Sequence, residues 1–141
     1  GDILGARVHR NPNGREIGVA RVAQIGQDPL FQGLPHTFPV IQTHMDAVHD
    51  CPEGMRVIAK NENTPIQSLA YGDFVRGVQW HPEFDAEVIA HYVRARAHLI
   101  EAESGAHAVD DILAGIQPVN TGAIILRNFM SHFLGLSKEA P

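Results

Sequence analysis

The stretch RGVQWHPEF (residues 76–84) ends an apolar run with a histidine and a glutamate two residues apart. Side chains at i and i+2 of an extended chain point to the same side, so His81 and Glu83 are expected to face one cleft where a strand ends. Pro82 fixes the backbone between them. A carboxylate beside an imidazole orients its tautomer and stabilises the imidazolium, as in catalytic triads. Spacing alone favours a simpler interpretation, in which His81 is a partly buried structural histidine and Glu83 opens the next helix.

The bulk composition is that of one globular domain, with 141 residues of which 44% are hydrophobic and 19% charged. The net charge of −5 and the dispersed Lys and Arg residues provide no basic stripe for phosphates, so no nucleic-acid partner is expected. No apolar run approaches the ~20 residues of a membrane-spanning helix, and the start lacks a signal-peptide pattern, so no membrane partner is expected. The single cysteine, Cys51, excludes an internal disulfide, and a cytoplasmic location is the expectation.

The first two thirds of the chain are predicted to form short strands separated by Gly-, Pro- and Asn-rich turns. The expected strands are ARVHR (6–10), EIGVARVAQI (16–25), TFPVIQTH (37–44), MRVIAKN (55–61), IQSLAYG (66–72) and FVRGVQW (74–80). Pro39 predicts an edge position or a bulge for its strand. The short connections predict antiparallel neighbours in places. DAVHDCPEG (46–54) is predicted to be a polar connection.

The last third of the sequence changes to helical spacing. Asp85 is placed to cap a helix whose apolar positions are 88, 89, 92, 93, 99 and 100. A second helix has apolar positions 109, 112, 113 and 116, and EAESGAH (101–107) is expected to join the two. A third helix is predicted with Thr121 as its cap and Gly135 as its stop.

Taken whole, GVQWHPE (77–83) strongly resembles the closing signature of class I glutamine amidotransferases, G-[VI]-Q-[FW]-H-P-E. LGARVHRNPNGREIG (4–18) is similar to the segment after the family's nucleophile helix, and PVIQTHMDAV (39–48) to its Ser/Thr-His-x-Asp strand end. Residues 51–84 follow the family's order of strand, strand and signature, and ILRNFM (125–130) resembles its C-terminal helix. The resemblance covers nearly all of residues 1–135, and the nearest subgroup is the stand-alone, GMP-synthase-like type.

The resemblance implies an α/β fold, with a flavodoxin-like, mostly parallel sheet, flanking helices and antiparallel strands at one side. Residues 1–141 are expected to be a single domain, the C-terminal half to two thirds of an amidotransferase domain whose N-terminal strands are missing. Ile3 and Leu4 before Gly5, typical of the last turn of a helix, fit a start in mid-fold. Because a parallel sheet is normally covered on both faces, its open edge is expected to pair with the missing segment or to drive self-association.

The resemblance assigns His81 as the catalytic base and Glu83 as the acid that orients it. In the family these residues act on a cysteine in a G-x-C-x-G elbow, which forms a glutamyl thioester and releases ammonia, and no cofactor is expected. This sequence has no G-x-C-x-G, and the family's cysteine position falls before Gly1. Cys51, in HDCPEG with His49 nearby, lies at neither an elbow nor a helix start, so it is interpreted as an incidental loop cysteine.

Three further residues, Thr43, His44 and Asp46, match the strand end that borders the family's glutamine pocket. The resemblance implies a substrate-binding role for them, and a solvated loop is the equal alternative. Glu16, in GREIG, matches a recurrent family position without an assigned role. The nine histidines are scattered, with no H-E-x-x-H or Cys-x-x-Cys spacing, so no metal site is expected.

Three functions stay open at the level of sequence. The first is an amidotransferase that hydrolyses L-glutamine to glutamate and passes ammonia to an acceptor or synthetase partner on another chain. The second is an inactive, truncated relative that keeps the fold as a binding or assembly module. The third is a γ-glutamyl peptidase or hydrolase that uses the same Cys-His-Glu logic.

Overall fold

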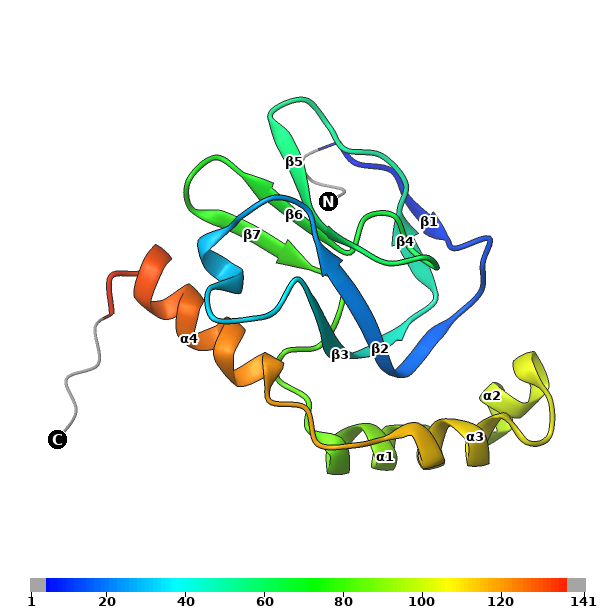
Figure 1. Ribbon diagram of the computed structural model, residues 1–141. Coiled ribbons are helices and arrows are strands. Elements are labelled where there is room, and N and C mark those ends of the chain that lie inside the picture. The colour runs from blue at the N-terminus through cyan, green and yellow to red at the C-terminus, as the bar shows by residue number, and fades with distance from the viewer. Residues whose placement is uncertain (1–4, 137–141) are drawn as a thin grey trace, which may run out of the picture.

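The computed structural model describes residues 5–136, in which strands dominate the first part and helices the last (Figure 1). The strands are β1 (Val8–Arg10), β2 (Glu16–Gln24), β3 (Thr37–His44), β4 (Asp46–Val48), β5 (Met55–Lys60), β6 (Ser68–Tyr71) and β7 (Val75–Val78). The helices are the short 3-10 helix η2 (Pro29–Phe31), α1 (Ala86–Ala95), α2 (Ala97–Ser104), α3 (Ala108–Gly115) and α4 (Thr121–Phe133). The predicted change from strands to helices near residue 85 is confirmed.

Five strands form the main sheet in the order β3-β2-β5-β6-β7, and every neighbouring pair is antiparallel. The α/β class is confirmed, but a mostly parallel sheet is not what residues 5–136 form. The short connections explain the difference, because parallel neighbours need crossover connections of about a dozen residues or more. Within this sheet β3 is an edge strand, which confirms the edge position that Pro39 predicts.

A second, two-stranded sheet pairs β1 with β4 in antiparallel register, with His9 opposite Ala47. The prediction of a polar connection over residues 46–54 is wrong for its first three residues, which form β4. Three residues are too few to show an alternating pattern in the sequence. Ala47 is buried in the folded chain, where β4 pairs with β1, a strand far from it in the sequence.

The apolar core consists of two clusters on different sides of the fold. One lies between the main sheet, η2 and α4, and contains Val22, Leu30, Phe31, Phe38, Val40, Ile58, Ala59, Ala70, Trp80 and Ile125. The other joins β3 to helices α1, α2 and α3, and contains Ile41, Ile89, Val93, Ile100 and Val109. Figure 1 shows the matching arrangement, with α4 beside the sheet and α1 to α3 grouped near the ends of β2 and β3.

The caps of α1 and α4 follow the predicted signals with one shift, but the predicted helix over positions 88–100 is divided at Arg96 into α1 and α2, and α2 takes in residues 101–104 of the predicted joint. The carboxylate of Asp85 accepts a hydrogen bond from the Val88 backbone N–H at 2.8 Å, so the predicted cap of α1 is confirmed. The predicted cap of α4 is wrong by one residue, since Asn120 takes the cap position and Thr121 is the first helical residue, buried in the fold. Gly135, with φ of 64°, lies just past the end of α4 as predicted.

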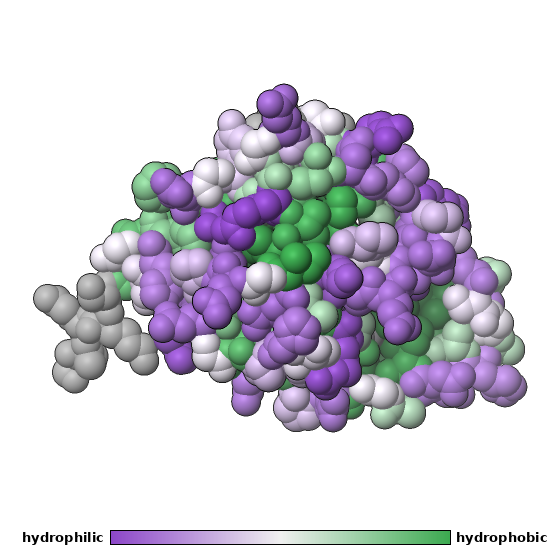
Figure 2. Space-filling model, turned by 45° about the horizontal axis from the view of Figure 1, so that its top comes forward, coloured by the Kyte–Doolittle hydropathy of each residue, from purple (hydrophilic) through white to green (hydrophobic). Residues whose placement is uncertain are grey.

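Apolar surface is exposed on one face of the described part of the chain. Figure 2 shows a hollowed hydrophobic area in the middle of that face, with hydrophilic residues around it. A groove of about 260 Å³ lies between the two sheets, lined by Val8, Val48, Ile66, Gln67, Ser68, Leu69, Gly77, Val78 and Gln79.

The helix end predicted at Ile3 and Leu4 lies outside the described residues. None of the helices described has the length and apolar character needed to cross a bilayer.

Candidate active site

His81 and Glu83 lie in the segment that follows β7. Trp80 is buried in the core beside Phe31 and Phe38, which anchors the backbone just before His81. The His81 backbone N–H donates a hydrogen bond to the Ile41 carbonyl oxygen at 2.9 Å, so the segment is also held by β3. His81 is therefore fixed where the apolar run of the sequence ends.

The imidazole of His81 and the carboxylate of Glu83 form a direct hydrogen bond, with 2.7 Å between Nδ1 and Oε1. Burial works to raise the pKa of the Glu83 carboxyl, but the hydrogen bond from His81 brings that pKa below its usual value. An ionised carboxylate only accepts hydrogen bonds, so the proton of neutral His81 belongs on Nδ1. Nε2 is then the basic nitrogen, on a side chain that is 33% exposed.

Phe84 covers one face of the His81 ring. The two ring centroids are 4.4 Å apart and the planes differ by 26°. Phe84 also contacts Tyr92 of α1 and packs against the core of helices α1 to α3. The imidazole is thus held by a carboxylate at Nδ1 and by an aromatic ring on one face, a role for Phe84 that its place in HPEF does not reveal.

The end of β3 lies beside this segment. The side-chain amide of Gln79 donates a hydrogen bond to the backbone carbonyl of Asp46 at 3.4 Å, while the Asp46 side chain is exposed. Thr43 lies two residues beyond Ile41, and its Oγ1 is buried without a hydrogen-bond partner within residues 5–136. The hydrogen bond from Gln79 thus connects Asp46 to the segment that contains His81. Thr43 lies on β3, the strand whose Ile41 carbonyl binds the His81 backbone.

His44 differs from its two neighbours because it belongs to a buried polar network. Its side chain is 8% exposed, Nδ1 lies 2.9 Å from the Asp46 carbonyl oxygen, and Nε2 lies 3.3 Å from Oε2 of Glu16. Both ring nitrogens thus face oxygen atoms of the protein. His44 holds the turn after β3 in place, and it does not offer a free nitrogen to solvent.

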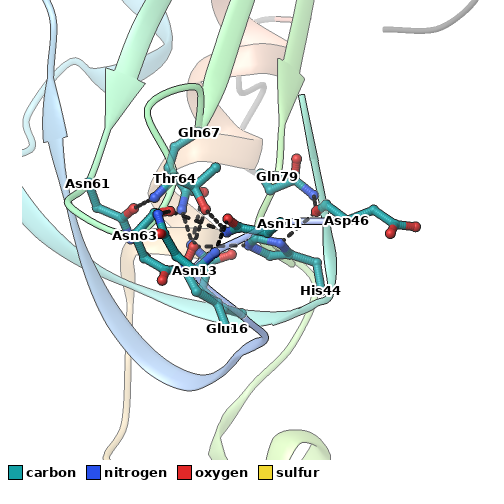
Figure 3. A network of polar contacts seen from close by, with 11 residues as sticks. Asn11, Asn13, Glu16, His44, Asp46, Asn61, Asn63, Thr64, Gln67 and Gln79 are labelled. Atoms are coloured by element: carbon teal, nitrogen blue, oxygen red, sulfur yellow. Dashed lines mark hydrogen bonds and ion pairs between the residues drawn. The ribbon is translucent and has the colours of Figure 1, made fainter. Parts of the chain in front are cut away.

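Glu16 is the centre of this network, which Figure 3 shows from close by. Its Oε2 accepts hydrogen bonds from Thr64 Oγ1 at 2.7 Å and Gln67 Nε2 at 2.8 Å, and its Oε1 accepts one from Asn61. Burial works to raise the pKa of Glu16, but the donors, with His44 first among them, lower it to about 2. Glu16 is therefore a buried carboxylate that ties together the start of β2, the end of β3 and the loop 61–67.

Cys51 is exposed in the loop between β4 and β5, with neither an elbow nor a helix start around it. Nearby, the rings of His9 and His49 stack with centroids 3.4 Å apart. In the part of the chain that the structure describes, no three His, Cys, Asp or Glu side chains are grouped as a metal site would require.

The sequence family described as "Glutamine amidotransferase class-I" matches residues 1–98, which is more than half of the chain. The chain belongs to this family. The GMP synthase [glutamine-hydrolyzing] of Thermosipho melanesiensis is 37% identical over 96 residues, covering 64% of this chain and 18% of that protein. A GMP synthase [glutamine-hydrolyzing] subunit from Pyrococcus abyssi is 32% identical over 82 residues, covering 57% of this chain and 43% of that protein.

Solved structures show the same fold over almost the whole chain. A glutamine amidotransferase from Thermotoga maritima superposes with a TM-score of 0.77 at 24% identity, covering 96% of this chain and 57% of that one. A glutamine amidotransferase from Methylobacillus flagellatus gives a TM-score of 0.72 at 17% identity, covering 99% of this chain and 60% of that one. The chain thus spans at most about three fifths of these amidotransferases.

Proposed function

We propose that His81 and Glu83 are the base and the orienting acid of a glutamine-hydrolysing site that converts L-glutamine to glutamate and ammonia. The observation that carries this proposal is the 2.7 Å contact from Nδ1 of His81 to Glu83 Oε1, which leaves Nε2 as the basic nitrogen. Membership of the class I glutamine amidotransferases supplies the reaction class. The nucleophile of the proposed triad is a cysteine from outside these 141 residues, because Cys51 has no elbow around it.

The chemistry of the pair follows from its geometry. Nε2 of His81 takes the thiol proton, and the sulfur attacks the carboxamide carbon of glutamine. The imidazolium, stabilised by Glu83, gives that proton to the departing nitrogen, so ammonia leaves and a glutamyl thioester remains. His81 then takes a proton from water, hydroxide adds to the thioester, and the returned proton restores the thiol as glutamate leaves.

Thr43 and Asp46 are proposed as part of the glutamine pocket. Asp46 exposes its carboxylate at the end of β3, while its backbone carbonyl accepts a hydrogen bond from Gln79, and a negative charge there suits the α-ammonium group of an amino acid. Thr43 has a buried hydroxyl without a protein partner within residues 5–136, which is free to bond a substrate atom. His44 contributes indirectly, because it holds the backbone of Asp46.

The acceptor of the ammonia is proposed to lie on another polypeptide. The relative from Pyrococcus abyssi is named as one subunit of a GMP synthase, which supports a separate synthetase partner.

Ammonia release from glutamine tests the proposal in two preparations. One is the 141-residue chain, and the other is the protein translated from the whole reading frame that encodes it. The proposal predicts turnover only in the second preparation, with an in-frame G-x-C-x-G before Gly1. Turnover by the chain alone that Cys51→Ala abolishes would identify Cys51 as the nucleophile. A reading frame with no such cysteine and no turnover would favour a binding or assembly module.

A further inference from the structure

Gly122, the second residue of α4, lies directly against the backbone of Pro82. A Cβ atom at Gly122 would overlap the Pro82 carbonyl oxygen and would lie 2.9 Å from its carbonyl carbon and 3.1 Å from its Cα. All three are backbone atoms, so no flexible side chain is available to move aside. Pro82 is the residue between His81 and Glu83, so the first turn of α4 contacts the backbone that joins the proposed base to its acid.

The backbone of Gly122 itself gives no reason for a glycine. Its φ lies outside the left-handed range that favours glycine, and it is within a helix, where alanine is the better residue. The close approach to Pro82 is therefore what requires the missing side chain.

Helix α4 is anchored firmly enough to transmit this contact. Ile125 is 3% exposed in the core that the sheet shares with α4, and Thr121 is also buried. Nδ2 of Asn128 donates hydrogen bonds to the carbonyl oxygens of Leu30 at 3.0 Å and Gln32 at 2.8 Å. Because α4 is held in place by these contacts, a side chain at position 122 is expected to displace the Pro82 backbone and not the helix.

We propose that Gly122 is a positioning residue for the His81–Glu83 pair. By allowing α4 to contact the Pro82 backbone, it fixes the angle at which the Glu83 carboxylate meets Nδ1 of His81. The effect on catalysis rests on the proposed glutamine hydrolysis, whereas the effect on the hydrogen bond does not.

The hydrogen bond is tested in the 141-residue chain by nitrogen-15 NMR of the His81 ring, which distinguishes a proton on Nδ1 from one on Nε2. We expect the Nδ1–H tautomer in the wild-type chain and loss of this preference in Gly122→Ala. The matched control is Gly115→Ala, also in a helix, where an added Cβ meets nothing within 4 Å. A folded Gly122→Ala chain with the wild-type His81 spectrum would overturn the inference, even if its melting temperature were lower.

A second variant decides the question if Gly122→Ala does not fold. Asn128→Ala removes the two hydrogen bonds that hold α4 to η2 and adds no atom near Pro82. We expect partial loss of the Nδ1–H preference of His81, because the contact at Pro82 loosens. An unchanged His81 spectrum in this variant would count against the inference.

Activity gives the remaining readout, in the protein translated from the whole reading frame. Gly122→Ala is expected to lower kcat for glutamine hydrolysis by about 10- to 100-fold, with KM nearly unchanged, because small misplacements of catalytic groups are costly. A change confined to KM would contradict a role at the pair. Absence of glutamine hydrolysis in the wild-type protein would refute the proposed function, while the NMR result would still decide the role of Gly122.

Discussion

At the scale of single residues, Glu83 and Glu16 are two carboxylates in contrasting surroundings. Glu83 is largely exposed and binds one imidazole, so its charge determines which nitrogen of His81 is basic. Glu16 is buried, and its charge is stabilised by His44 and by the side chains of Asn61, Thr64 and Gln67 from distant parts of the chain. The first arrangement suits proton transfer and the second suits fixing the backbone around a site.

Glu16→Gln is expected to destabilise the fold by about 1–3 kcal/mol, because an amide nitrogen replaces one acceptor oxygen among groups that are all donors. Chemical denaturation with urea measures this loss. Glu62→Gln is the matched control, since Glu62 is exposed in the loop 61–67, other side chains of which bind Glu16, and it should be nearly neutral. Equal stability of the two variants would show that the network around Glu16 contributes nothing net.

The stability that Glu16 provides should depend on acid pH. Its pKa is about 2 in the folded chain against an ordinary value of 4.5, so the unfolded chain binds the proton more readily between these values. The contribution is therefore complete above about pH 4.5 and is lost as pH falls toward 2. The difference in unfolding free energy between wild type and Glu16→Gln should shrink over this window. A difference that grows on acidification would have the opposite sign and would contradict the lowered pKa.

At the scale of elements, two helices border the segment that carries the pair. Helix α1 begins directly after it, with Asp85 as its cap, and α4 contacts its middle through Gly122. Phe84 packs against the core of helices α1 to α3 and covers one face of His81. The site is thus built on a short loop whose neighbours are rigid elements, which is the usual way of holding catalytic groups.

Asp85→Ala should cost about 1 kcal/mol of stability, because the Val88 N–H loses its side-chain acceptor at the start of α1. Thermal unfolding followed by circular dichroism measures the loss. Glu101→Ala, at an exposed position within α2, is the control and should change the melting temperature little. A melting temperature for Asp85→Ala that equals the control's would mean that the cap is not stabilising.

At the scale of the whole molecule, the sequence predicts the features that depend on neighbours along the chain. Alternation, turn residues and helical spacing predicted most elements, and the i, i+2 rule brought His81 and Glu83 to the same side. These local patterns do not predict contacts between residues that are far apart in the sequence. Glu16 meets Thr64 and Gln67 about 50 residues away, and Gly122 meets Pro82 forty residues away, so neither pairing leaves a local pattern. The order of the strands in the sheet could not be predicted from the sequence for the same reason.

The exposed edge at β7 should make the 141-residue chain self-associate. Within the described residues β7 pairs only with β6, its first residue Val75 is 49% exposed, and the preceding Phe74 is 72% exposed. Sedimentation velocity is expected to show mass that rises with concentration, and Val75→Lys should reduce it. Leu99→Lys, an exposed apolar position on α2, is the control. A compact 15.4 kDa monomer at all concentrations would contradict this expectation.

The central claim, that His81 serves as the base of a glutamine-hydrolysing site, is tested most directly by one comparison of rates. Ammonia release from glutamine is measured for wild type, His81→Ala and His91→Ala, each in the protein translated from the whole reading frame. His91 is exposed on α1 and serves as the control. The account predicts a loss of roughly 100-fold or more in kcat for His81→Ala and no loss for His91→Ala. Wild-type turnover by His81→Ala would contradict it.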